Sequence, residues 1–159
     1  MKYIRIGKIV NTHGIKGELR ILSDFRYKTK VFVPNFKFYV GKDKKEFIVN
    51  SYRFHKVFDM VTFKGFNNIN DVEYLKGEYV FINEEDLTLD DGEFLSSNLI
   101  GYTMYIGDKL VGEISEIVDT PANEVLRCGN VLVPYVKEFI NKIDTENKII
   151  YINDVRGLI

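Results

Sequence analysis

The chain is a succession of short apolar segments, most of them ended by a turn signal. Near its start, Ile4, Ile6 and Ile9 are set among polar residues mostly in alternation, which is typical of a strand with one buried face. Twelve Phe and ten Tyr residues, with no Trp, also favour strands. No apolar run approaches the roughly 20 residues that a membrane-spanning helix needs. The sequence therefore predicts an all-β protein with no membrane partner.

The first half is predicted to form a small closed barrel. Six strands are expected, at residues 3–10, 18–22, 36–40, 47–54, 57–63 and 78–82. A short helix is expected from Asp71, with Asn70 as its N-cap and Gly77 at its end. Closing the sheet would remove its exposed edges, so a six-stranded barrel is the expected arrangement.

The second half is predicted to be another small barrel, of about five strands, after an acidic linker. The strand signals lie at residues 102–106, 110–118, 124–128, 131–136, 139–143 and 148–152. Residues 84–93 hold six carboxylates, whose mutual repulsion favours an extended segment. A divalent-ion site is the alternative, but the spacing is not that of a calcium loop. We expect a domain at 1–83, a linker at 84–93 and a domain at 94–159.

Charge is divided unevenly along the chain. Residues 1–66 hold 15 Lys/Arg and 5 Asp/Glu, a net of +10, and residues 67–159 hold 7 and 18, a net of −11. Such a division suggests two domains that face different partners, although solvated surface charge can also segregate by chance. Aromatic residues interleave the basic ones, a composition that RNA-binding β-surfaces use. Most of these rings are expected to fill the barrel core.

The sequence offers no catalytic or metal-binding constellation. With two His and one Cys in the whole chain, a structural zinc site is close to excluded. Cys128 lies in an expected strand and is interpreted as a small buried hydrophobe, and a single Cys fits a reducing cytoplasm. His55 is expected in a solvated hairpin turn. We therefore expect a cytoplasmic protein that is not an enzyme and has no metal and no cofactor.

The loop from His13 to Gly17 is the sharpest local feature. Gly14 and Gly17 permit backbone conformations that other residues avoid, and they leave backbone amides open to a partner. Three cations belong to the same candidate contact site: Lys8, Lys16 and Arg20. One interpretation is a loop that contacts phosphate or protein. The other is a tight connection between strands, with His13 bonded to the loop backbone, and the two interpretations are compatible.

Pro134 and Tyr135 form a second candidate site. Proline lacks the backbone donor that a central strand needs, so Pro134 is expected at a strand edge or bulge. Tyr135 beside it is either an exposed anchor for a protein partner or a ring packed inward, and inward packing is slightly favoured.

Motifs spread over the chain resemble the RimM family of ribosome maturation factors. The opening motif GKIVNTHGIKGELRI covers residues 7–21. Further motifs are NLIG at 98–101, LVGEI at 110–114, PANEVL at 121–126, VPYV at 133–136 and the closing GL at 157–158. Each motif alone is weak, but their shared order and spacing are specific.

The resemblance implies a barrel like one found in translation factors, followed by a PRC barrel. It also implies binding to the head of the immature small ribosomal subunit, where the second domain engages the head protein numbered nineteen and the factor promotes ribosomal RNA processing. The basic domain would contact RNA. The alternatives are an RNA-processing enzyme and a general RNA-binding module without a ribosomal protein partner. A monomer is expected.

One pair of positions departs from the family pattern. The family usually carries two aromatic residues just before the second domain, and they are tied to ribosome binding. Here Phe94 and Leu95 stand at these positions. The resemblance therefore implies that Phe94 keeps a ring contact without a hydroxyl, while Leu95 keeps only apolar bulk.

Overall fold

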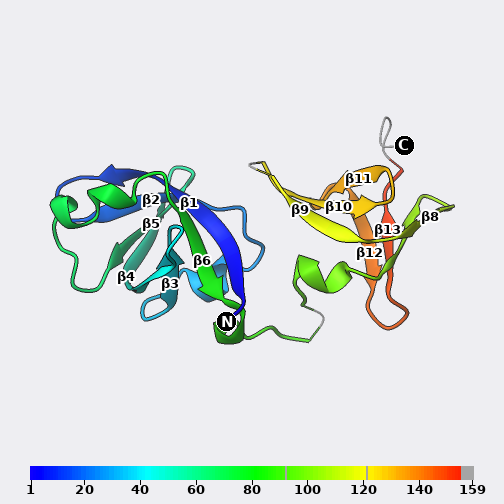
Figure 1. Cartoon of the computed structure of the whole chain (residues 1–159), viewed down its shortest axis with the longest axis horizontal. Helices are drawn as coiled ribbons and strands as arrows, with labels where there is room; N and C mark the ends of the chain where they lie inside the picture. Colours follow the sequence, from blue (N-terminus) through cyan, green and yellow to red (C-terminus); the bar gives the residue numbers. More distant parts are fainter. Residues whose placement is uncertain (92, 121, 155–159) are drawn as a thin grey trace. The chain divides into compact units, whose positions relative to one another are not determined.

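The computed structural model describes residues 1–91, 93–120 and 122–154, and the chain divides into two compact units (Figure 1). These units are Met1–Thr88 and Leu89–Ile159, so the division falls inside the acidic segment. The domain limits at 83 and 94 stay predictions. Three residues of the family pattern lie outside the described residues: Pro121, Gly157 and Leu158.

The first unit is a closed six-stranded barrel, as the sequence predicts. Its strands are β1 (Tyr3–His13), β2 (Glu18–Leu22), β3 (Lys37–Val40), β4 (Lys45–His55), β5 (Phe58–Phe63) and β6 (Tyr79–Asn83). Their order around the barrel is β1-β2-β5-β4-β3-β6, with every pair antiparallel. Because β1 pairs with both β2 and β6, the sheet has no free edge.

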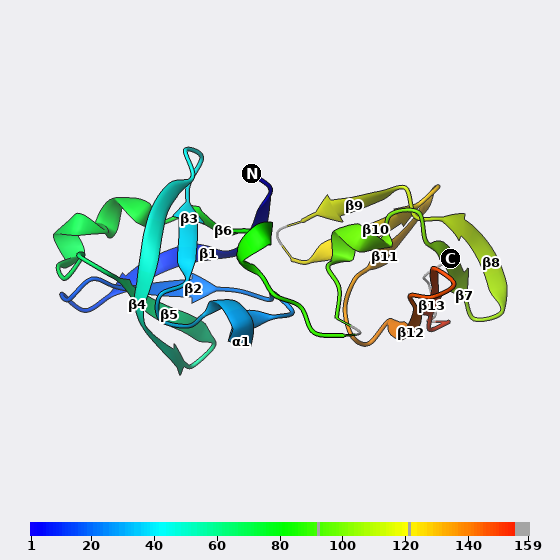
Figure 2. The ribbon, with the colours of Figure 1, turned by 90° about the horizontal axis from the view of Figure 1, so that it is seen from below.

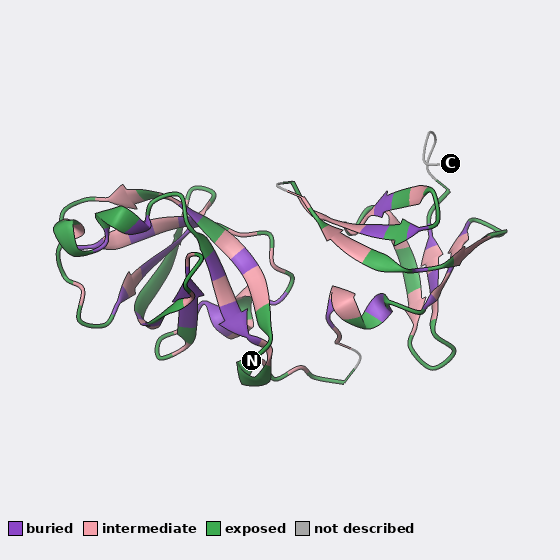
Figure 3. Ribbon diagram, in the orientation of Figure 1, coloured by how far each residue is buried: buried purple, intermediate pink, exposed green. Residues whose placement is uncertain are grey.

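The barrel interior is filled by the apolar residues that alternate along its strands. Ile9, Leu19, Ile21, Phe38 and Phe63 are all fully buried there. Figure 3 shows these strands with buried residues alternating with exposed and half-buried ones. Irregular registers in β1 and β4 mark bulges that bend these two long strands around the barrel.

Two short segments of the first unit differ from the predicted structure. The helix expected from Asp71 is instead a pair of 3₁₀ turns, η1 (Ile69–Asp71) and η2 (Glu73–Leu75). The cap is Asn68, whose side chain accepts a hydrogen bond from the Asn70 amide at 2.9 Å. The turns end because Val72 and Leu75 must both reach the core. The sequence did not predict the one-turn helix α1 (Lys28–Val31). This helix is labelled in Figure 2.

The second unit has seven strands in two sheets rather than about five. One sheet has the order β11-β10-β9, from β9 (Glu116–Asp119), β10 (Glu124–Cys128) and β11 (Val131–Pro134). The other has the order β12-β13-β7-β8, from β7 (Thr103–Ile106), β8 (Lys109–Glu113), β12 (Ile140–Asp144) and β13 (Ile149–Ile152). The strand expected at 110–118 breaks because buried Ile114 turns into the core between β8 and β9. The all-β prediction is confirmed.

The start of the acidic segment is folded rather than extended. Glu84–Asp86 form a 3₁₀ turn, η3, in which the Asn83 side chain accepts a hydrogen bond from the Glu85 amide at 3.1 Å. Leu87 then packs against the core of the barrel. Counted by unit, Met1–Thr88 carries 16 Lys/Arg and 11 Asp/Glu, a net of +5, and Leu89–Ile159 carries 6 and 12, a net of −6. The charge difference is therefore smaller than the division at residue 66 suggests, but its sign is the same.

Candidate functional site

The two glycines of the β1–β2 loop have different roles. Gly17 is buried with φ +87°, and a Cβ placed on it would lie 2.7 Å from the Phe66 carbonyl oxygen. Gly14, with φ +71°, has open space where a Cβ would stand. The Ile69 amide donates to the Ile15 carbonyl at 3.0 Å, which fixes the loop against η1. Gly17 is therefore required by packing, while Gly14 is required only by its backbone conformation.

Gly17→Ala is expected to lower the free energy of unfolding of the first unit by about 2 kcal/mol or more, because the methyl group meets a carbonyl and the backbone is left-handed. Gly14→Ala is the matched control and should cost about 1 kcal/mol, since only the backbone term applies. Urea unfolding followed by circular dichroism measures both. Equal losses for the two variants would contradict the packing role of Gly17.

Beside the loop, His13 and Arg20 contact each other on the barrel surface. The Arg20 Nη2 donates to the His13 Nδ1 at 2.6 Å, and the guanidinium lies 5.5 Å from the centre of the Phe58 ring. Because arginine stays protonated, Nδ1 of His13 is the acceptor and the ring proton stands on Nε2. The interpretation of His13 as bonded to the loop backbone is therefore wrong. His55 is half-buried, with its ring centre 6.2 Å from that of His13, and is not simply solvated.

A two-pronged ion pair borders this contact. The Arg53 Nε and Nη2 atoms donate to the two carboxylate oxygens of Glu18 at 2.8 Å and 2.7 Å. The hydrogen bond from Arg53 holds the pKa of Glu18 below its ordinary value. Arg53 is thus neutralised locally, and Lys16, exposed at the loop tip and without an ion pair among the described residues, is the cation that the loop itself presents.

Lys8 lies apart from that contact. Its ammonium is 5.4 Å from the centre of the Tyr79 ring on β6, the same ring that the Arg5 guanidinium approaches to 4.8 Å. The structure therefore brings His13 and Arg20 together, places Lys16 at the adjoining loop tip, and places Lys8 beside β6 with a ring and a second cation.

In the second unit, the two candidate segments are tied to the same residue. The Glu124 backbone carbonyl accepts a hydrogen bond from the Tyr135 amide at 2.8 Å. The Glu124 carboxylate accepts another from the Ser96 hydroxyl at 2.6 Å. The segment with Phe94 and Leu95 and the segment with Pro134 and Tyr135 are thus both anchored to β10. Sequence reasoning missed Ser96 and Glu124, because neither carries a signal before the strands are paired.

The exposure of these four side chains differs. Leu95 is 8% exposed, and its amide donates to the Asn98 side chain at 3.0 Å, at the start of η4 (Ser96–Leu99). Phe94 and Tyr135 are half-buried and pack against the core. Pro134 is half-buried at the end of β11, which is an edge strand of the three-stranded sheet. Phe94, Pro134 and Tyr135 therefore keep surface that a partner can reach, and Leu95 keeps little.

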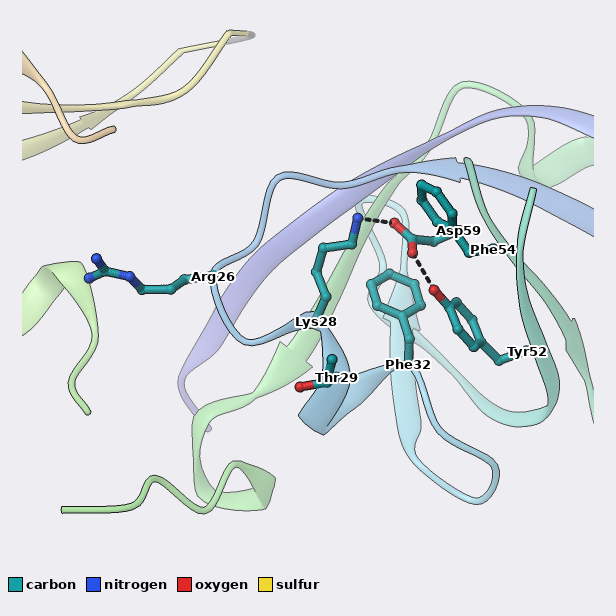
Figure 4. A pocket seen from close by; sticks show the side chains of 7 residues that line it. All are labelled: Arg26, Lys28, Thr29, Phe32, Tyr52, Phe54 and Asp59. Atoms are coloured by element: carbon teal, nitrogen blue, oxygen red, sulfur yellow. Dashed lines mark hydrogen bonds and ion pairs between the residues drawn. The ribbon is translucent and has the colours of Figure 1, made fainter. Parts of the chain in front are cut away.

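A hollow of about 380 Å³ at one end of the barrel contains an ion pair between a buried carboxylate and a half-buried lysine that sequence reasoning missed (Figure 4). The Asp59 carboxylate is fully buried; its Oδ2 lies 2.6 Å from the Lys28 ammonium, and its Oδ1 accepts from the Tyr52 hydroxyl at 2.7 Å. Burial first, and then the hydrogen bond and charge of Asp59, raise the pKa of Tyr52. The arrangement holds β5, β4 and α1 together at this end.

Cysteine and possible metal ligands are the remaining groups of chemical interest. Cys128 is buried in the second core, and burial raises the pKa of its thiol, as expected of a small core residue. Within residues 1–91, 93–120 and 122–154, no three His, Cys, Asp or Glu side chains gather so that they could hold a metal ion. Over the same ranges, no helix has the length and apolarity to cross a membrane.

Comparisons with known proteins match both units. The RimM N-terminal domain matches residues 4–87, and the RimM PRC barrel domain matches residues 96–158. A protein of Exiguobacterium sibiricum named ribosome maturation factor RimM is 40% identical, with 100% of this chain and 99% of the relative covered. Its namesake in Staphylococcus epidermidis is 38% identical, with 98% of each chain covered.

Two solved structures are similar at lower identity. A crystal structure from Pseudomonas aeruginosa, titled a 16S ribosomal RNA processing protein RimM, is 20% identical with a TM-score of 0.43, over 96% of this chain and 97% of that one. The solution structure of the N-terminal domain of RimM from Thermus thermophilus is 18% identical with a TM-score of 0.48, over 56% of this chain and 98% of that one. On the two domain matches and the full-length relatives, the chain belongs to the RimM family.

Proposed function

We propose that this protein is a ribosome maturation factor that binds the immature small ribosomal subunit at its head. The observation that carries the proposal is the match of both domains, over nearly the whole chain, to proteins named ribosome maturation factor RimM. In this proposal the protein acts in the cytoplasm as a monomer and promotes small-subunit ribosomal RNA processing by binding, without catalysing cleavage itself.

Each unit has its own partner in the proposal. The first unit, with a net charge of +5, contacts ribosomal RNA, whose phosphates attract Lys and Arg. The loop cation Lys16 and the His13–Arg20 contact belong to this side. The second unit, with a net charge of −6, binds the head protein numbered nineteen through Phe94, Pro134 and Tyr135. Opposite charge on the two surfaces would orient the factor between RNA and a basic protein.

Co-sedimentation tests the proposal directly. The purified protein is expected to sediment with immature small subunits, and to do so more than with mature subunits or with free ribosomal RNA. Equal binding to all three would favour a general RNA-binding module. Incubation with precursor RNA and magnesium, without other factors, is expected to leave the RNA intact, and specific cleavage would replace the proposal with an enzymatic one.

Phe94→Ala is expected to weaken binding to immature subunits about tenfold, because truncating an aromatic anchor at an interface typically costs 1–2 kcal/mol or more. Phe94→Tyr, which keeps the ring, should bind as tightly as the unchanged protein. Leu110→Ala, a truncation on β8 of a side chain 58% exposed, is the control. Titration of labelled protein measures all three, and unchanged affinity of Phe94→Ala in a folded variant would remove Phe94 from the site.

A further inference from the structure

One side of the barrel carries rings and cations in alternation. We call it the aromatic-basic face, and it consists of Tyr3, Arg5, Lys8, Lys44, Tyr79 and Phe81. These residues come from β1 and β6, which Figures 1 and 2 both show side by side, and from the end of the β3–β4 turn. None of the six belongs to the core cluster of the barrel.

Strand register places the cations against the rings. Lys8 stands opposite Tyr79, and Arg5 stands opposite Phe81. The Arg5 and Lys8 charges lie 4.8 Å and 5.4 Å from the centre of the Tyr79 ring. The Lys44 ammonium lies 4.1 Å from the centre of the Phe81 ring and 5.7 Å from that of Tyr3. Three cations are thus held by three rings, with the Tyr3 and Phe81 ring centres 6.4 Å apart.

The rings remain accessible although cations lie near them. Tyr3 is 36% exposed and Tyr79 is 37% exposed, while Phe81 is half-buried. Lys8 and Lys44 make no ion pair within the described part of the chain. Carboxylates stand at the margin: burial first, and then the charges of Glu46 and Asp86, raise the pKa of Tyr39. The face itself therefore keeps positive charge and partly open ring surface together.

A lysine over a ring can also be simple surface packing, and the same barrel shows such a case. Lys45 lies 5.5 Å from the centre of the Tyr74 ring and donates to its hydroxyl at 2.9 Å. The Lys45 ammonium also lies 5.4 Å and 6.0 Å from the centres of the Phe47 and Phe66 rings, so a single lysine lies among several rings here. Lys44 ends the β3–β4 turn, and its ammonium lies over the rings of Phe81 and Tyr3. Lys45 begins β4 and contacts Tyr74 instead, so the two lysines serve different surfaces. The aromatic-basic face differs in its repetition: cations and rings recur along two paired strands.

We propose that the aromatic-basic face binds an unpaired stretch of ribosomal RNA. Arg5, Lys8 and Lys44 meet its phosphates, and the rings of Tyr3 and Tyr79 stack on its bases. Charge complementarity selects a polyanion, and the accessible rings select single strands, since bases in a duplex are already stacked and cannot reach a ring. The inference rests on the proposed function for the identity of the RNA, and it adds which face binds and which form of RNA it prefers.

Fluorescence anisotropy with a labelled single-stranded RNA of about 12 nucleotides tests the face, with a duplex of equal length as the comparison. We expect the single strand to bind more tightly. Tyr79→Leu should weaken its binding about tenfold, as loss of one stacking ring typically does. Tyr79→Phe keeps the ring and should bind like the unchanged protein. Tyr74→Leu, beside Lys45 and outside the aromatic-basic face, is the matched control and should have no effect.

The salt dependence of RNA binding gives a second readout, because a change in the stability of the protein does not alter the slope of affinity against salt. Lys8→Ala/Lys44→Ala should flatten the slope of log affinity against log salt by about 1.4, since each phosphate contact to a single strand contributes about 0.7. A Tyr79→Leu variant that binds like the unchanged protein, or equal affinity for duplex and single strand, would overturn the inference. If face variants co-sediment normally with immature subunits, the face is wrong and the proposed function stands. If the unchanged protein binds the single strand but no immature subunit, the proposed function fails instead.

Discussion

Lys28→Met is expected to lower the free energy of unfolding of the first unit by about 3 kcal/mol. Methionine is close to lysine in size, so the substitution mainly removes the charge. The Lys28 ammonium is 2.6 Å from a carboxylate that solvent does not reach. Without it, the Asp59 carboxylate keeps, among the described residues, only the hydrogen bond from Tyr52 at 2.7 Å. Removing one partner of a buried pair leaves an uncompensated charge, which costs more than the pair itself contributes.

The geometry shows why methionine does not relieve that cost. The lysine stem is partly covered, and its ammonium also donates to the Ser23 carbonyl at 3.1 Å and lies 5.4 Å from the centre of the Phe54 ring. Methionine can fill the space of the lysine side-chain stem, so the loss of stability comes from the missing charge and not from a cavity. Since small domains are stable by only about 5–15 kcal/mol, such a loss would be visible as a clear shift in urea midpoint.

A double-mutant cycle separates charge from packing. Lys28→Met/Asp59→Asn removes both charges and should be more stable than Lys28→Met alone, because no ion is left buried without a counter-charge. Lys37→Met, an exchange at an exposed position at the start of β3, should change stability by no more than about 0.5 kcal/mol. If the double variant is less stable than Lys28→Met, the buried charge is not the cause of the loss.

Much of the fold could be predicted because strand alternation and turn residues are local signals. The first strand of the barrel follows from the near-alternation of Ile4, Ile6 and Ile9 with polar residues. The bulge between Arg5 and Gly7, which lets both Ile6 and Ile9 face the core, has no such local signal. The prediction of a short helix from Asp71 was wrong because Val72 packs into the core within one turn. Capping residues do not reveal such a tertiary contact. The break between β8 and β9 escaped prediction for the same reason: burial of Ile114 depends on the opposite sheet.

The candidate site was only partly predictable because its contacts cross strands. The glycine and lysine of the β1–β2 loop are visible in sequence, but the pairing of His13 with Arg20 exists only through β1–β2 register. The Lys28–Asp59 pair joins residues 31 positions apart, and no local pattern marks it. The aromatic-basic face is similar, since Lys8 and Tyr79 become neighbours only when the barrel closes. The composition predicted basic and aromatic residues together; it could not say which rings stay outside the core.

Binding of the protein to immature small subunits is expected to weaken about fiftyfold between 50 and 200 mM monovalent salt. The estimate assumes four contacts to single-stranded phosphates, at about 0.7 counterions each, which gives a log–log slope near −2.8. The four cations are Lys16 of the loop and Arg5, Lys8 and Lys44 of the aromatic-basic face. Contacts between the acidic unit and a basic ribosomal protein would weaken in the same direction, because salt screens exposed charges.

The measurement is the equilibrium affinity at several salt concentrations, with magnesium held constant so that the subunit keeps its structure. Replacing Lys8 and Lys44 by alanine should flatten the slope, whereas Phe94→Ala should shift the whole line downward and leave its slope unchanged, since a ring contact releases no counterions. These two responses are independent because the substitutions lie in different units. An affinity that is nearly flat with salt would contradict phosphate contact by the barrel, and a slope changed equally by Phe94→Ala would contradict the assignment of RNA and protein to separate units.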